Sequence, residues 1–173
     1  LSGGDAAART IDFLEKRVGA SQLACLVAEP IQGEGGFIVP AEGFLPELLS
    51  WCKDNGIVYI SDEVQSGMAR TGKYFASEHF GIEPDLVTSA KGIGGGMPIA
   101  AVTGRAEIMD SSHPGGLGGT FGGNPVSSAA VVAVFEEVKD RNLLAEASRV
   151  ESTLKPALEK LQKKYPQVGD VRG

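Results

Sequence analysis

Four short runs of apolar or β-branched residues, separated by segments with helical periodicity, constrain the fold more than any other feature of the sequence. The runs cover residues 23–28, 57–60, 85–88 and 99–103. Strands that are apolar on both faces are typical of a parallel sheet with helices on each side. The sequence therefore predicts an α/β fold with a mostly parallel sheet and helices on both faces.

Helical periodicity fills the intervals between and after these runs. Apolar positions three or four residues apart predict helices over residues 5–18, 43–55, 73–80, 125–139 and 143–164. Gly56 suits a helix C-terminus, and Asn124-Pro125 suits a helix N-terminus. Pro156 lies inside the last segment. Because proline removes a helical hydrogen bond, we expect a kink or break there.

Composition excludes several classes of partner. The net charge of −6 argues against nucleic acid or an anionic membrane, and no apolar run reaches the length of about 18 residues that a membrane span needs. Cys25 and Cys52 lie in apolar stretches without metal-binding spacing, so we expect both to be buried and the protein to be cytoplasmic. His79 and His113 have no ligand partners at a suitable spacing, and we expect no metal site.

Glycine is the compositional outlier, with 24 of 173 residues, and it gathers in clusters that suit close backbone approach to a ligand. Two of the glycine motifs resemble nucleotide-binding loops but are incomplete. The motif from Gly67 to Lys73 nearly forms a phosphate loop, yet Tyr74 stands where a serine or threonine should bind Mg²⁺. The Gly92–Gly96 cluster is followed by a strand rather than by the helix of a dinucleotide site, so both are chance matches.

Three polar residues lie at or just beyond strand ends, where ligands bind in sheets of this kind. Glu34 follows the first strand, Asp62 ends the second and Lys91 follows the third. Asp62 suits a structural salt bridge, a helix cap, or a partner for a cationic ring nitrogen. Lys91 suits a solvated surface lysine or, in a partly apolar pocket that lowers its pKa, a nucleophilic amine.

Several blocks in a fixed order resemble the class III (ω-amino acid) aminotransferases, which have the aspartate-aminotransferase-like fold type I of pyridoxal-phosphate (PLP) enzymes. The central blocks are Asp62-Glu63-Val64-Gln65-Ser66-Gly67, Arg70-Thr71-Gly72, Pro84-Asp85 and Lys91. Flanking blocks at residues 29–36 and 118–125 match as well. The resemblance runs through the whole chain and favours a catalytic Lys91 over a solvated one.

This resemblance implies a role for each matching residue. Lys91 would form the internal Schiff base with PLP and then act as general base and acid. Asp62 would keep the pyridinium nitrogen protonated, so that the ring serves as an electron sink. Val64 would pack on the ring, and Gln65 would hydrogen-bond near its 3-hydroxyl. Thr120 would reach the phosphate of a neighbouring subunit's cofactor, which implies a homodimer with a shared active site. Alternatively, Gln65 is a polar loop residue and Thr120 a turn hydroxyl.

Glu34 and the loop at residues 114–121 bear on the substrates. In ω-amino acid aminotransferases the matching glutamate pairs with an arginine, here absent from the sequence, and thereby lets one pocket accept both substrates. The 114–121 loop is most similar to that of 4-aminobutyrate aminotransferases. The resemblance thus implies 4-aminobutyrate as amino donor and 2-oxoglutarate as the 2-oxo acid acceptor, giving succinate semialdehyde and glutamate. An ornithine or acetylornithine aminotransferase is the alternative, and Glu34 could also be a solvated loop acid.

The family's domain plan implies that residues 1–142 are the central part of the PLP-binding large domain and residues 143–173 the start of the small domain. The chain starts without Met, and we expect it to be a piece of a longer protein with little activity by itself. Two rivals stay open: a non-catalytic piece of the fold, and a PLP-dependent mutase. The intact Asp62, Gln65, Lys91 and Thr120 disfavour the first, and Glu34 disfavours the second.

Overall fold

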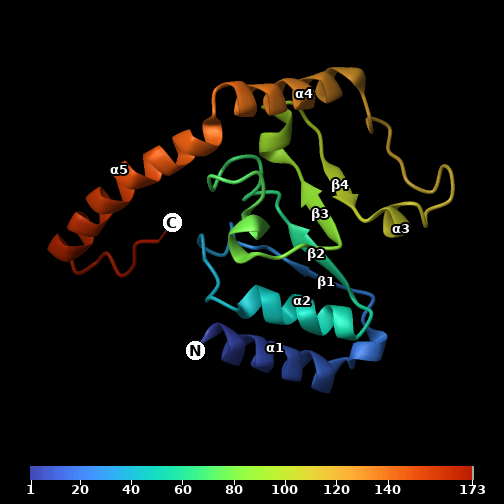
Figure 1. The fold of residues 1–173 in the computed structure, drawn as a ribbon, viewed down its shortest axis with the longest axis horizontal. Coiled ribbons are helices and arrows are strands. Elements are labelled where there is room, and N and C mark those ends of the chain that lie inside the picture. The colour runs from blue at the N-terminus through green and yellow to red at the C-terminus, as the bar shows by residue number, and fades with distance from the viewer. Residues whose placement is uncertain (173) are drawn as a thin grey trace.

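A four-stranded sheet forms the centre of the computed structural model, which describes residues 1–172 (Figure 1). Its strands are β1 (Cys25–Ala28), β2 (Val58–Asp62), β3 (Leu86–Ser89) and β4 (Ala101–Gly104), in that spatial order. β1, β2 and β3 are parallel neighbours, and β4 is antiparallel to β3. The sheet is therefore mostly parallel, as the sequence predicts.

Two helices cover one face of this sheet. They are α1 (Gly3–Arg17), which packs on α2 (Phe44–Asp54), and α2 itself, which packs on β2. The hydrophobic core lies in this layer and consists of Ala7, Leu45, Leu48, Leu49, Cys52, Ile57, Tyr59 and Ile82. Gly56, with φ +67°, ends the α2 segment in the left-handed conformation that glycine adopts without strain.

The remaining helices lie elsewhere. Four are short: the 3-10 helices η1 (Ala20–Gln22), η2 (Ala76–Phe80) and η3 (Lys91–Gly94), and the α-helix α3 (Ala106–Met109), which follows β4. The long α4 (Pro125–Asp140) packs against η3, and α5 (Leu143–Lys164) extends from α4 away from the sheet (Figure 1). Asn124 caps α4, because its side chain accepts a hydrogen bond from the Ser127 N–H at 2.9 Å.

Two expectations about individual residues are wrong. Cys52 is buried, but Cys25 is exposed, because the alternation along β1 turns Cys25 and Val27 to the face opposite α2. Of the kink or break expected at Pro156, the break does not occur, since α5 continues through it. A proline removes one backbone donor, and the uninterrupted turns on either side keep the helix together.

Candidate active site

The carboxylate of Asp62 is held in place at the C-terminal end of β2. Its Oδ1 atom accepts hydrogen bonds from the Thr88 hydroxyl at 3.0 Å and from the Val64 N–H at 3.1 Å. Thr88 is also its register partner on β3. Among residues 1–172 no hydrogen bond engages Oδ2, so this half-buried carboxylate keeps one oxygen for a further partner.

Lys91 lies three residues beyond Thr88, where β3 has ended and η3 begins. Its backbone is left-handed, with φ +50°, a conformation that costs energy for a residue with a side chain and is often found at functional sites. The side chain is exposed and lines a cavity of about 240 Å³. The other lining residues are Phe37, Val64, Gln65, Gly67, Arg70 and Gly92. Three predicted residues, Lys91, Val64 and Gln65, thus share one cavity.

Glu34 joins this group through Gln65. The Gln65 side-chain amide donates a hydrogen bond to Glu34 Oε1 at 3.1 Å. This approach needs a glycine at position 33, because a Cβ there would lie 2.3 Å from the Gln65 side-chain carbonyl carbon. The two loops that follow β1 and β2 are therefore in direct contact, as expected for segments at the same edge of a parallel sheet.

Thr120 is not part of this cavity. It is exposed in the segment at residues 110–124, which joins α3 to α4 and projects to the side of the sheet opposite α5 (Figure 1). In the single chain Thr120 is therefore not among the residues that line the Lys91 cavity. Its role toward a second subunit stays a prediction.

Two buried acids were not recognised in the sequence as parts of the site. Glu63 is 1% exposed and Asp85 is 5% exposed. For Glu63 a signal was present, because Tyr59, Ser61 and Glu63 alternate onto one face at the end of β2 and all three are buried. For Asp85 the sequence offered its place at the start of a strand and the Pro84-Asp85 block of the family resemblance, but nothing that indicated its burial.

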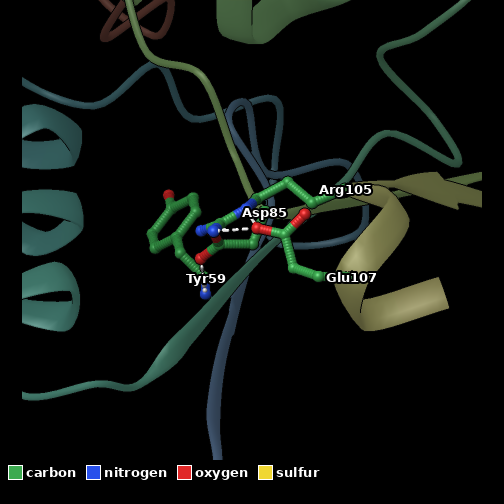
Figure 2. Close-up of polar contacts among 4 residues, drawn as sticks. All are labelled: Tyr59, Asp85, Arg105 and Glu107. Carbon is green, nitrogen blue, oxygen red and sulfur yellow. Dashed lines mark hydrogen bonds and ion pairs between the residues drawn. The ribbon is translucent and has the colours of Figure 1, made fainter. Parts of the chain in front are cut away.

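Asp85 lies directly before β3 and contacts Tyr59 of β2 and Arg105, which follows β4 (Figure 2). Its Oδ2 accepts a hydrogen bond from the Tyr59 N–H at 2.8 Å, and its Oδ1 pairs with Arg105 Nη1 at 2.7 Å. Arg105 also binds Glu107 through Nε, at 2.8 Å. Burial alone raises the pKa of Asp85, but the Tyr59 hydrogen bond and the Arg105 guanidinium outweigh it, so the pKa lies below its ordinary value.

Burial acts without such compensation on two neighbours of this cluster. It raises the pKa of the Cys52 thiol to about 11, with the Asp85 charge adding to the effect. It likewise raises the pKa of Tyr59 to about 12, with smaller contributions from Cys52 and Glu63. Both groups therefore stay protonated at neutral pH, and neither is a nucleophile.

Possible metal ligands do not form a group among the described residues. Within residues 1–172 no group of three or more histidine, cysteine or acidic side chains could hold an ion. His79 and His113 are both exposed, and His79 Nε2 lies 2.9 Å from the Thr71 carbonyl oxygen. Of the helices in this same part of the chain, none combines the length and the apolar character needed to cross a bilayer.

Comparison with known proteins decides the family. Residues 2–173 match the family model of class-III aminotransferases. The chain belongs to the class-III aminotransferases. It is 57% identical to the 4-aminobutyrate aminotransferase of Mycobacterium tuberculosis over 175 residues, which cover 99% of this chain and 39% of that protein. The chain thus spans about two fifths of the length of such a relative.

Solved structures agree with this class-III assignment. The taurine:2-oxoglutarate aminotransferase of Bifidobacterium kashiwanohense, solved with PLP and glutamate, matches with a TM-score of 0.92 and 34% identity, over 98% of this chain and 39% of that one. The ornithine aminotransferase of Toxoplasma gondii matches with a TM-score of 0.88 and 37% identity, over 94% and 39%. The fold predicted from the sequence is therefore confirmed as that of the PLP-dependent aminotransferases.

Proposed function

We propose that this chain is the central part of a PLP-dependent aminotransferase that transfers the amino group of 4-aminobutyrate to 2-oxoglutarate. One observation carries the proposal. Lys91 lines a cavity with Val64 and Gln65, while the anchored carboxylate of Asp62 ends the neighbouring strand. A primary amine, an amide and a carboxylate with a free oxygen form the donor set that PLP requires, so these residues fit the cofactor.

PLP supplies an electron-withdrawing ring that stabilises negative charge on the carbon next to the amino nitrogen. Asp62 would hold a proton on the ring nitrogen, because its Oδ2 atom is left for a further partner. Its Oδ1 atom is already fixed by Thr88 and by the Val64 N–H, so the carboxylate is oriented before the cofactor arrives. Such preorganisation lets a charged group act without a reorganisation cost.

Lys91 Nζ would hold the cofactor and would then take the proton from the donor carbon that carries the amino group. The short η3 helix fixes the backbone position of Lys91, and α4 packs against η3. Val64 would pack on the ring, and Gln65 would donate to the oxygen at the ring's 3-position. Both side chains line the same cavity as Lys91.

Glu34 bears on the choice of substrate. The Gln65 amide holds its carboxylate close to the cavity, where it can pair with an arginine when the donor lacks an α-carboxylate. The identity of 57% to a protein named 4-aminobutyrate aminotransferase supports this donor. The likeness to an ornithine aminotransferase structure, at 37% identity, supports ornithine or acetylornithine as the second candidate.

Borohydride reduction tests the cofactor site. The full-length protein is mixed with PLP, reduced and mapped by peptide mass spectrometry. We expect a phosphopyridoxyl group on Lys91, its loss in Lys91→Ala, and no change in Lys73→Ala, which removes an exposed lysine outside the cavity. An unlabelled Lys91 in the full-length protein would support the non-catalytic alternative instead.

A rate comparison tests the substrates. Initial rates of amino transfer to 2-oxoglutarate are measured with 4-aminobutyrate, ornithine and acetylornithine as donors. We expect 4-aminobutyrate to be fastest. A much faster reaction with ornithine would replace the proposed donor, and transfer confined to a single substrate molecule would indicate a mutase.

Three further expectations belong to the proposal. Thr120 reaches the cofactor phosphate of a second subunit, so that the enzyme is a homodimer. Residues 1–142 belong to the large domain, and residues 143–173 begin the small one. Since Cys25 and Cys52 are both free thiols, we also place the enzyme in the cytoplasm.

A further inference from the structure

Glu63 is a buried acid without a cationic partner. Its side-chain carboxylate accepts three hydrogen bonds: from the Ser66 hydroxyl at 2.6 Å, the Ala76 N–H at 2.9 Å and the Ser77 N–H at 2.8 Å. None of the ion pairs between residues 1–172 includes Glu63. Because a buried charge is costly unless donors surround it, these three contacts are what make the carboxylate tolerable here.

The donors lie at both ends of one loop, which we call the β2–η2 loop (residues 63–75). Ser66 is near its beginning, whereas Ala76 and Ser77 form the start of η2 just beyond its end. The Glu63 backbone adds two links: its N–H donates to the Thr88 carbonyl at 3.0 Å, and its carbonyl accepts from the Gly67 N–H at 2.9 Å. The hydrogen bonds of Glu63 thus link the two ends of the loop to each other and to β3.

The backbone of this loop is strained, so it needs stabilising contacts to keep its conformation. Met68 and Ala69 are buried and left-handed, with φ +55° and +66°. Side-chain-bearing residues adopt this conformation only when the surroundings enforce it. Met68 in turn packs near η3, since a Cβ placed on Gly92 would lie 3.5 Å from Met68 Cβ.

The same loop supplies the cofactor side of the Lys91 cavity. Val64 and Gln65 lie between Glu63 and Ser66 in the sequence. The side chains of Glu63 and Ser66 form the shortest of the three hydrogen bonds to the carboxylate. We propose that Glu63 is a positioning residue, whose carboxylate holds the β2–η2 loop in its strained form and thereby aims Val64 and Gln65 at the cofactor. This inference deepens the proposed function and rests on it.

Glu63→Gln is the substitution that tests the proposal, in the full-length protein. A carboxamide has one acceptor oxygen, and its NH₂ group would face an N–H or O–H donor whichever way it turns. Two readouts apply besides activity: amide hydrogen exchange of residues 63–77 without cofactor, and the PLP dissociation constant from the absorbance of bound cofactor. We expect faster exchange in this segment and PLP binding weaker by about tenfold, as the loss of a hydrogen bond to a buried charge implies.

Two control variants separate positioning from general stability. Glu78→Gln makes the same chemical change on an exposed side chain of η2, which accepts one hydrogen bond from the Phe75 N–H. Leu48→Ala destabilises the core of α2, remote from the loop. Both should leave the PLP dissociation constant within about twofold of the wild-type value, at a temperature where each variant is folded.

The outcomes are distinct. Weaker PLP binding and faster local exchange in Glu63→Gln alone support the proposal. An unchanged PLP dissociation constant in Glu63→Gln overturns it and leaves the proposed function standing, whereas a wild-type protein that fails to bind PLP overturns both. If Glu63→Gln does not fold, Ser66→Ala removes one of the three donors and replaces it in the test. The expected weakening is then about threefold, and unchanged PLP binding again overturns the proposal.

Discussion

The two ends of this chain bury very different amounts of surface. The layer formed by α1, α2 and β2 contains a continuous hydrophobic core, with Leu45, Cys52 and Tyr59 at 1% exposure or less. In contrast, no residue of α5 is buried in the part of the chain that the structure describes, and the segment at residues 110–124 is largely exposed. The first region folds onto itself, whereas the second presents its apolar side chains to the outside.

The candidate site divides along the same line. Asp62 ends a packed strand, and its position follows from the sheet register, while the half-buried Val64 follows two residues later. Glu34, Lys91 and Thr120 are exposed. The described residues therefore fix where the backbone of each candidate catalytic residue lies. They do not shield the side chains of Glu34, Lys91 and Thr120 from water. Under the proposed homodimer, a second subunit would supply part of that shielding.

A pair of leucine substitutions provides the strongest test of this contrast. Leu48→Ala should lower the free energy of unfolding by about 3 kcal/mol, because a fully buried side chain leaves a cavity. Leu161→Ala in α5 removes a side chain that is 46% exposed and should cost less than about 1 kcal/mol. Urea unfolding of the 173-residue chain gives both values. Equal losses would show that α5 is as firmly packed as α2.

Asp85 offers a second test, inside the packed region. Asp85→Asn should lower the free energy of unfolding by about 2 kcal/mol at neutral pH, because the Tyr59 N–H and Arg105 lose a charged acceptor. The folded-state pKa of Asp85 lies below its ordinary value of 3.8. Its stabilisation is therefore complete above about pH 5 and is lost as the pH falls through the folded-state pKa.

The measurement is urea unfolding of wild type and Asp85→Asn between pH 7 and pH 2.5. The difference between the two should stay constant at neutral pH and shrink in acid. Glu107→Gln is the matched control, because Glu107 binds the same arginine from an exposed position. A difference that grows as the pH falls would contradict the depressed pKa of Asp85.

The parts of the structure that follow from local periodicity were predictable. The four strands, the long helices and the strand-end positions of Asp62 and Lys91 follow from apolar runs and helical periodicity, and the start of α4 follows from its cap at Asn124. The order of the motif blocks added the family and the fold. The strands and helices depend on residues that are close in the sequence. The family depends on several motifs that are specific only when they occur together and in order.

Features that depend on distant contacts were not predictable. β4 runs antiparallel because residues 90–100 hold only the short η3 helix, too little for a crossover back to the same sheet edge. The exposure of Cys25 depends on which face of β1 the helices cover. The three donors to Glu63 come from residues up to 14 positions away, and only the folded loop brings them together.

The N-termini of α4 and α5 give the smallest predicted effect and a matched pair of asparagines. Asn124 accepts a hydrogen bond from the Ser127 N–H, so Asn124→Ala should lower the free energy of unfolding by about 1 kcal/mol. Asn142 precedes α5 with φ +50° and makes no side-chain capping bond, so Asn142→Gly should change it by less than about 0.5 kcal/mol. Urea unfolding measures both values. A larger loss at Asn142 would mean that α5 depends on its first turn, although α5 buries no residue among those described.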